Sequence, residues 1–368
     1  MKLQLKNTPE QVELIRAMGS KDQTAAREAQ EAFAAFLGPV VQQVLLQAGT
    51  AGGIFNDAPF DEDDSPSFPL DLYYGENDNH VTVWSQNMAG GLPSSHIAGM
   101  QELKIATYRL DSAVNWLKKY ARRARLDVVS KAVERMAQEV LVKQERNAWA
   151  VILKALGEAS TGGNTHTIAA TTDNVLQVDD FNRLMTRIKR INESFANGTP
   201  DVAYSNGMTD LYLSPEMMQQ IRSWAYQPMN TRAVPDTAES TALGLPDNVR
   251  EGIYRSAGMQ EIFGVNLIEL NELGISKKYN TLFDAYTSGN IAPDAGAFAT
   301  ANEEILVGVD NSKGAFIRPV AQHEESGGQF VTFADDQWSA RSEKVGFYGF
   351  LEEGRVCIDA RAVVGIVV

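Results

Sequence analysis

The chain has 368 residues, 44% of them hydrophobic and 22% charged, so it is long enough to form about two or three domains with buried cores. Its formal net charge of −14 argues against a general nucleic-acid binder, because neutralising phosphates requires a basic face. The first residues lack the apolar segment of a signal peptide, and no window approaches the ~18 consecutive apolar residues of a membrane span. We therefore predict synthesis in the cytoplasm and no membrane partner.

Charge is segregated along the first half of the chain. No Lys or Arg lies between Arg27 and Lys104, and eleven acidic residues give that stretch a formal charge of −11. From Lys104 to Lys154, twelve basic and five acidic residues give +7. Opposite charges on adjacent segments indicate surfaces that meet each other, and we expect the acidic stretch to lean on a neighbouring copy. The candidate interface residues are Asp57, Asp61, Glu62, Asp63, Asp64, Asp71, Glu76, Asp78, Lys118, Lys119, Arg122, Arg123, Arg125, Arg135 and Arg146.

The first elements in chain order are helices, which form a predicted N-terminal arm over residues 1–53. Thr8-Pro9-Glu10-Gln11 is typical of a helix start, with Thr8 as cap, Pro9 at the first helical position and Gln11 completing a capping box. A second helix is predicted over residues 22–47 from apolar residues that recur every three to four positions. Pro39 should bend or split this helix, and Gly49 should end it.

Residues 54–100 are predicted to form an extended excursion with little core of its own. Strand-like pieces at 70–74 and 80–84 flank turn-forming residues at 75–79, so the pattern indicates a long β-hairpin. Such an excursion usually serves a function. The acidic cluster from Asp61 to Asp64 could bind a divalent cation, but it lacks the spacing of a calcium loop, and a solvated acidic loop is the preferred interpretation.

Residues 101–160 begin with an alternating strand at 103–110, followed by a short helix capped by Asp111 or Ser112. The longest predicted helix then covers 127–156, which corresponds to about 45 Å. The basic residues from Lys118 to Arg125 lie near two aromatic residues, so DNA contact is one interpretation. The acidic character of the whole chain favours the other, an interface or a solvated face.

Residues 161–300 alternate between helices and strands. Asp179 or Asp180 should cap a helix that reaches about residue 195, and a strand at 211–213 should lead into a helix capped by Ser214. Residues 227–248 read as a surface loop, and 263–270 as a strand introduced by a glycine. The last part, 301–368, is predicted to be mostly β, with strands at 305–309, 315–320, 329–333, 345–351 and 355–368 and a turn at 352–354.

The chain shows no local signature of catalysis, cofactor binding or metal binding. The four histidines lack metal-ligand spacing, and we predict neither a metal site nor a cofactor. The single cysteine, Cys357, lies in an alternating run and is predicted to be a small buried apolar residue, with a catalytic thiol as the minor alternative. The carboxylate pairs Glu303-Glu304 and Glu352-Glu353 fall where turns or helix ends are expected, so we assign them no chemistry.

The order of these parts resembles the major capsid protein of tailed double-stranded DNA bacteriophages, a fold shared with encapsulins and the herpesvirus capsid floor. The resemblance covers essentially the whole chain and rests on order and local texture more than on an invariant motif. It is carried by the strand 103–110 leading into the long helix with Lys143-Gln144-Glu145-Arg146-Asn147-Ala148, by Leu211-Tyr212-Leu213-Ser214-Pro215, by Ile262-Phe263-Gly264-Val265-Asn266-Leu267, and by residues 341–368.

The resemblance implies an α+β capsid fold with five parts. These are an N-terminal arm at 1–53, an extended loop at 54–100, a peripheral domain that starts at 101–160 with a spine helix at 127–156, a mainly axial α/β domain at 161–300, and a closing β-region at 301–368. In the family the extended loop reaches over the adjacent subunit. Some relatives crosslink covalently through a lysine in this loop, but residues 54–100 contain none.

The implied function is a non-enzymatic shell protein that assembles into hexamers and pentamers of an icosahedral head and encloses double-stranded DNA without reading its sequence. Only about fifty residues precede the extended loop, which implies a separate scaffolding protein. A portal is a further expected partner, a decoration protein is left open, and the expected location is the virion. The alternatives are an encapsulin-like compartment shell and, less favoured, an α/β hydrolase-type enzyme.

Overall fold

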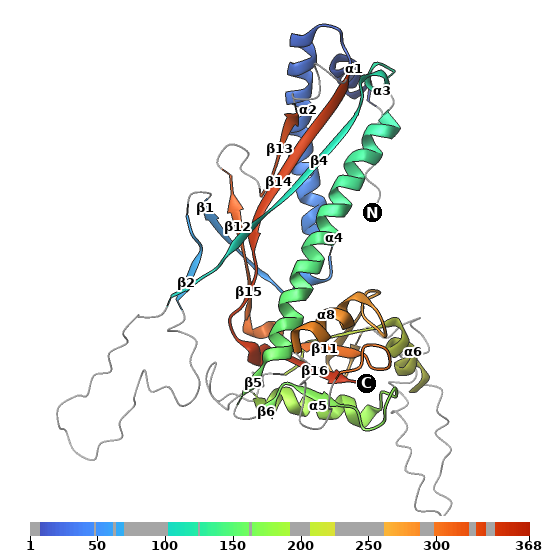
Figure 1. Cartoon of the computed structure of the whole chain (residues 1–368), viewed down its shortest axis with the longest axis vertical. Coiled ribbons are helices and arrows are strands. Elements are labelled where there is room, and N and C mark those ends of the chain that lie inside the picture. The colour runs from blue at the N-terminus through green and yellow to red at the C-terminus, as the bar shows by residue number, and fades with distance from the viewer. Residues whose placement is uncertain are drawn as a thin grey trace, which may run out of the picture. The chain divides into compact units, whose positions relative to one another are not determined.

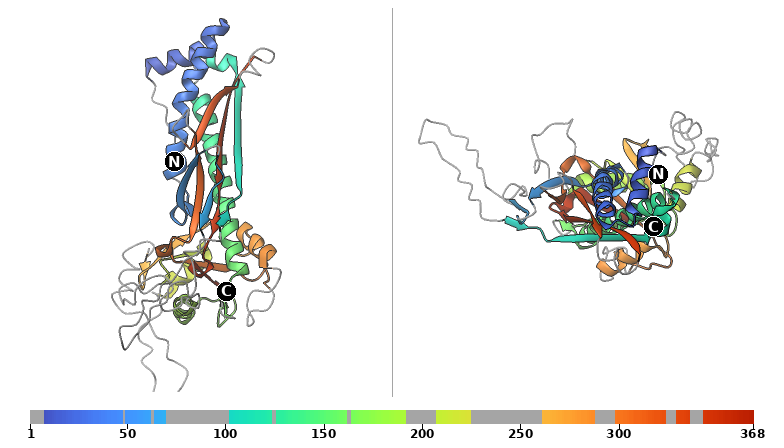
Figure 2. Two further views of the ribbon diagram at one scale, coloured as in Figure 1. Left: turned by 90° about the vertical axis from the view of Figure 1, so that its left-hand side faces the viewer. Right: turned by 90° about the horizontal axis from the view of Figure 1, so that it is seen from above.

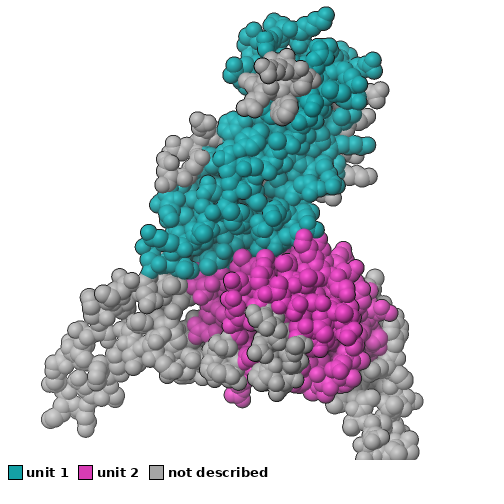
Figure 3. All heavy atoms as spheres, in the orientation of Figure 1, with its two compact units in different colours: residues 1–69, 102–148, 316–356 teal, residues 70–101, 149–315, 357–368 magenta. Residues whose placement is uncertain are grey.

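The structure is a computed structural model that describes residues 8–47, 49–61, 64–69, 102–123, 126–161, 164–191, 207–224, 261–287, 298–323, 329–335 and 343–368. It divides into two compact units (Figure 3). Unit 1 comprises Met1–Pro69, Glu102–Ala148 and Phe316–Val356, and unit 2 comprises Leu70–Gln101, Trp149–Ala315 and Cys357–Val368.

Two helices open unit 1. Helix α1 (Pro9–Met18) starts as predicted, because the Thr8 Oγ1 accepts a hydrogen bond from the Gln11 backbone N at 3.4 Å. Helix α2 (Gln23–Gln47) is continuous, so Pro39 does not split it. Leu37 and Val41, on either side of the proline, are completely buried, and their packing offsets the hydrogen bond that proline cannot donate. A short 3₁₀ turn, η1 (Ala51–Gly53), follows.

The sheet of unit 1 is organised around the long strand β14 (Lys344–Gly354). Strand β4 (Thr107–Leu117) pairs antiparallel with its whole length and forms the margin of the sheet (Figures 1 and 2). On the other side, β14 pairs first with β13 (Phe330–Asp335) and then with β12 (Phe316–Gln322). Strand β1 (Asn56–Asp61) adds parallel to β12, and β15 (Val356–Cys357) also pairs with β12.

One face of this sheet carries the core of unit 1. Alternate residues such as Trp116, Phe347 and Leu351 pack against α1, α2, α3 (Lys118–Arg122) and α4 (Leu126–Glu158). The Phe33 ring of α2 lies 5.2 Å from the Phe347 ring, centroid to centroid. The predicted long helix is confirmed as α4, and the first half of its apolar stripe, from Val129 to Val140, is buried in this core.

The strand that precedes α3 is longer than predicted. The structure contains β3 (Glu102–Lys104), paired antiparallel with β2 (Ser67–Pro69), and then β4, which continues to Leu117. The predicted helix at Asp111 or Ser112 is therefore wrong. Eleven consecutive pairs with β14 satisfy the backbone of this segment, and this pairing outweighs the local capping signal.

Unit 2 contains a mixed sheet with the strand order β7-β16-β11-β8-β10-β9. These strands are β7 (Thr167–Ala169), β8 (Asp210–Leu213), β9 (Glu261–Ile262), β10 (Val265–Glu269), β11 (Ile305–Val309) and β16 (Val363–Val367). The central strands β8, β11 and β16 are buried at every residue, as expected where both faces of a sheet are covered. A separate small hairpin joins β5 (Ser160–Thr161) and β6 (Asn164–Thr165).

Helices cover the sheet of unit 2. Leu211 and Leu213 pack with α5 (Val178–Ile191) and α6 (Pro215–Trp224), whereas the intervening Tyr212 contacts Trp149 at 4.9 Å between ring centroids. Trp149 also lies 5.6 Å from Tyr279 in α8 (Lys278–Thr287). The predicted start of α6 is confirmed, because the Ser214 hydroxyl accepts from the Met217 backbone N at 3.1 Å.

Two further predictions are corrected. Helix α5 begins at Val178, so neither Asp179 nor Asp180 is its cap, and Asp180 instead accepts from the Gln177 backbone N at 3.2 Å. Residues 352–354 are not a turn but the end of β14, and the predicted strand 355–368 is interrupted by the 3₁₀ turn η5 (Ala360–Ala362). A similar turn, η3 (Asn311–Lys313), follows β11. The predicted hairpin pieces at 70–84 and the loop at 227–248 lie outside the described residues.

Candidate functional site

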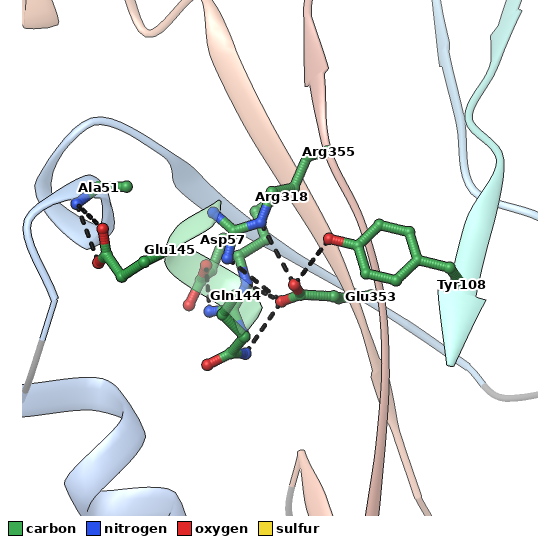
Figure 4. A network of polar contacts seen from close by, with 8 residues as sticks. All are labelled: Ala51, Asp57, Tyr108, Gln144, Glu145, Arg318, Glu353 and Arg355. Atoms are coloured by element: carbon green, nitrogen blue, oxygen red, sulfur yellow. Dashed lines mark hydrogen bonds and ion pairs between the residues drawn. The ribbon is translucent and has the colours of Figure 1, made fainter. Parts of the chain in front are cut away.

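A buried carboxylate, Glu353, is the centre of the most extensive polar network in the described part of unit 1 (Figure 4). Strand β14 positions it, because residues 345, 347, 351 and 353 all lie on the inner, buried side of the strand. Its side chain is 0% exposed. It accepts hydrogen bonds from Arg318 Nε at 2.7 Å, Tyr108 Oη at 2.9 Å, Gln144 Nε2 at 3.1 Å and Arg355 Nε at 3.3 Å.

The two guanidinium groups keep this carboxylate ionised. Burial by itself raises the pKa of Glu353, but the charges of Arg355 and Arg318 outweigh burial, so the pKa lies below its ordinary value. Burial and the nearby Glu353 charge raise the pKa of Tyr108 to about 12, which keeps its hydroxyl protonated as a donor. The arrangement thus contains a fixed negative charge with every partner donating to it.

The network extends to the first strand of the sheet. Arg318 Nη1 lies 3.2 Å from Asp57 Oδ1, so one arginine connects β1 to Glu353 in β14. Tyr108 comes from β4 and Gln144 from α4. Arg355 also stacks over the Phe55 ring, 4.9 Å from its centroid. Tyr108, Arg318, Arg355 and Gln144 therefore meet at Glu353, and Asp57 of β1 is connected to it through Arg318 (Figure 4).

The residue next to Gln144 makes a second connection to the N-terminal side of β1. Glu145 accepts from Thr50 Oγ1 at 3.0 Å and from the Ala51 backbone N at 3.2 Å. Gly49 has φ +122°, and a Cβ at this position would lie 2.3 Å from Glu145 Oε1. The positive φ favours glycine here, and any other residue would also force the Glu145 carboxylate to move.

The predicted basic interface residues cluster in part. Lys118, Lys119 and Arg122 lie on α3, and Arg123 follows it. Arg122 is anchored, since its Nε donates to the Gly19 carbonyl at 2.8 Å. Two of the remaining three lie on α4, where Arg135 pairs with Glu139 at 2.6 Å and Arg146 is half-buried.

The predicted acidic interface residues are only partly described. Asp57 is paired within the chain to Arg318, whereas Asp61 and Asp64 are exposed around the end of β1. The Asp64 carboxylate accepts from the Ser65 backbone N at 2.8 Å. The other predicted members, Glu62, Asp63, Asp71, Glu76, Asp78 and the basic Arg125, lie outside the described residues.

The described residues bring together no group of three side chains with metal-ligand chemistry. Across those same ranges, no helix combines the length and apolar composition needed to cross a bilayer. Cys357 is half-buried, and burial raises the pKa of its thiol to about 12, which is unsuited to a nucleophilic thiolate. The structure therefore directs attention to surfaces and to the Glu353 network.

Sequence reasoning missed Glu353 because the pair Glu352-Glu353 was assigned to a turn. The alternation of β14 contained a usable signal, since extending the buried positions 345, 347 and 351 by two residues predicts an inward side chain at 353. Glu304 was missed in the same way, and it is 1% exposed with its Oε1 accepting from the Ser214 hydroxyl at 2.9 Å.

No protein-family model and no curated protein matches this sequence. Solved structures do match. A chain of the capsid structure of the cyanophage P-SCSP1u aligns with a TM-score of 0.52 and 12% identity, over 87% of this chain and 88% of that chain. A chain of the mature capsid of bacteriophage PhiM1 aligns with a TM-score of 0.47 and 10% identity, over 87% and 86%.

The match to the cyanophage capsid establishes the fold, whereas the second likeness is too low to add to the argument. The sequence-based prediction of an α+β capsid fold is confirmed. This protein has the major capsid fold of tailed phages.

Proposed function

We propose that this protein is the structural subunit of an icosahedral phage head and assembles into hexamers and pentamers. The observation that carries the proposal is the capsid fold, which extends over 87% of the chain. A shell built from one kind of subunit needs repeated heterologous contacts, and the segregated charges of residues 28–154 are suited to make them. The location is then the virion.

The charged stretches provide the proposed contact between neighbours. Asp61 and Asp64 are exposed on one segment, and Lys119 and Arg123 are exposed on another. Each exposed pair contributes only ~0–1 kcal/mol, but the contact repeats around every ring of the shell. The acidic stretch of one copy meets the basic stretch of the next in this proposal.

The partners follow from the same function. Packaged double-stranded DNA is enclosed without sequence-specific contacts, which suits the net charge of −14. A separate scaffolding protein and a portal complete the assembly. The five parts at 1–53, 54–100, 101–160, 161–300 and 301–368 serve as arm, extended loop, peripheral domain, axial domain and closing β-region, with residues 227–248 at the capsomer centre.

Electron microscopy of the full-length protein, expressed alone and with its neighbouring head proteins, tests this function. Closed shells of uniform size support it, and double-stranded DNA in particles from infected cells distinguishes a phage head from a compartment that stores enzymes. A compact monomer that stays monomeric at high concentration under every condition would exclude the proposal.

A further inference from the structure

We propose that Glu353 is a positioning residue for shell assembly, because it clamps β1 to β4 across the seam between β12 and β14 in the unit 1 sheet. These two strands flank residues 62–106, which contain most of the predicted excursion and six of its acidic interface residues: Glu62, Asp63, Asp64, Asp71, Glu76 and Asp78. The inference rests on the proposed function, in which this excursion meets a neighbouring copy.

The seam is visible in the strand pairing. β1 joins the sheet through six parallel pairs with β12, and β4 joins it through eleven antiparallel pairs with β14. The β1–β12 pair of strands and the β4–β14 pair are joined where β12 meets β14. There the structure gives one backbone residue pair, Val320 with Glu353. The residue that makes this single backbone pair in β14 is therefore the one whose side chain gathers the buried network.

Side chains supply the connection that the backbone ladder lacks. A continuous chain of contacts runs from Asp57 in β1 to Arg318 in β12 at 3.2 Å, from Arg318 to Glu353 in β14 at 2.7 Å, and from Glu353 to Tyr108 in β4 at 2.9 Å. The Arg318 and Arg355 side chains are only 13% and 6% exposed, so they cannot exchange Glu353 for water while the seam stays closed.

The contacts that Glu353 makes with Arg318, Arg355, Tyr108 and Gln144, together with the Arg318–Asp57 ion pair, are called the clamp here. The clamp fixes the relative orientation of the strands more than it adds to the free energy of unfolding. A buried ion pair gains little over a well-packed apolar cluster of the same volume, because both charges lose their hydration. A carboxylate held by two guanidinium groups, a phenol and an amide nevertheless accepts only one arrangement of its partners. The clamp thus specifies how β1 and β4 are oriented, and any rotation between them changes where the intervening residues are presented to a neighbour.

The test compares two double variants with the same chemistry. Asp57→Asn with Tyr108→Phe removes the charge of the β1 contact and the hydrogen bond from β4, while leaving Glu353 with Arg318, Arg355 and Gln144. The matched control, Asp111→Asn with Tyr348→Phe, removes an equivalent contact from the exposed face of the same sheet, where the Tyr348 hydroxyl donates to Asp111 at 2.9 Å. Both are made in the full chain, and circular dichroism checks folding.

Two measurements are made on each variant: amide hydrogen exchange over residues 56–61 in unassembled subunits, and particle shape by negative-stain electron microscopy. We expect exchange over 56–61 to be about tenfold faster in the clamp variant and unchanged in the control, since one or two local hydrogen bonds are lost. Closed shells should be replaced by open or irregular particles in the clamp variant only.

Three results would overturn the inference. They are an exchange rate over 56–61 in the clamp variant within about twofold of the wild type, normal shells from the clamp variant, and equal defects in the clamp and control variants. If the clamp variant does not fold, the single Asp57→Asn variant carries the test, because this side chain is 38% exposed and its loss costs little stability. Failure of the wild-type protein to form particles under any condition would instead overturn the proposed function, and the exchange measurement would still decide whether the clamp exists.

Discussion

Two buried glutamates show how the same side chain behaves in opposite surroundings. Glu353 is surrounded by donors and cations, which hold its pKa below the ordinary value despite burial. Glu304 accepts one hydrogen bond from Ser214 and lies near Glu216, and burial raises its pKa to about 7. Acidification below the ordinary range of a carboxyl therefore weakens the Glu353 network, whereas raising the pH towards 7 charges Glu304 inside unit 2.

The substitution Glu304→Gln should make the stability of the protein less dependent on pH. Because the folded state binds the Glu304 proton more tightly, its stabilising contribution is complete below about pH 4.5 and is lost as the pH rises to about 7. The amide keeps an acceptor for Ser214 and carries no charge, so the variant should gain up to about 3 kcal/mol at pH 8 and nothing at pH 4. Urea unfolding at both values measures this, with Glu303→Gln as control; an equal gain at both pH values would contradict the assignment.

Gly49→Ala should destabilise the protein by about 2 kcal/mol or more. Its φ of +122° disfavours any Cβ, and the new atom would collide with the Glu145 carboxylate. Gly53→Ala is the control, because a Cβ there meets nothing within 4 Å. Thermal unfolding of the two variants compares them, and equal effects would rule out the close approach to Glu145.

At the scale of elements, the hairpin between β9 and β10 contains a turn that its sequence does not favour. Ile262 pairs with Val265, so Phe263 and Gly264 form a two-residue turn with φ values of +51° and +80°. Such turns need residues that tolerate positive φ, and Asn-Gly is the preferred pair. Phe263 is also 47% exposed, so its ring contributes limited burial.

Phe263→Asn should therefore stabilise unit 2 by about 0.5–1 kcal/mol. The matched control is Phe333→Asn in β13, a similarly exposed phenylalanine at 42% that lies in a strand and stacks on Phe350. There the same replacement should cost about 1 kcal/mol, because asparagine is disfavoured in strands. Chemical unfolding should give opposite signs for the two variants, and a loss of stability in both would show that the Phe263 ring matters more than its backbone strain.

At the scale of the whole molecule, assembly should depend on the separation of charge along the chain. Replacing Asp61, Glu62, Asp63 and Asp64 by Lys should prevent shell closure while leaving the subunit folded, because the basic stretch of the neighbour would then be repelled. Assembly of the wild type should also weaken between about 0.1 and 1 M salt as screening increases. The control variant reverses Glu13, Glu158, Asp173 and Glu261, which are exposed acids outside the acidic stretch. Light scattering and electron microscopy measure the result, and normal shells from the first variant would exclude this role of the cluster.

Elements with local signals could be predicted from the amino-acid sequence alone. Thr8-Pro9 and Ser214-Pro215 start helices where predicted, most of the apolar stripe of α4 is buried, and the strand at 305–309 appears with the predicted bounds. The order of these elements was sufficient to predict the capsid fold. Such signals work because caps, prolines and apolar periodicity act within one element.

Features that depend on pairing and burial between distant segments became visible only in the folded chain. β14 holds β4 extended past Asp111 and carries Glu353 into the interior, although the local residues favour a helix start and a turn. The clamp joins residues 57, 108, 144, 318, 353 and 355, and no pattern in one stretch of sequence specifies their meeting. A buried charge is stable only where several donors converge on it, and that convergence exists only after the sheet has formed.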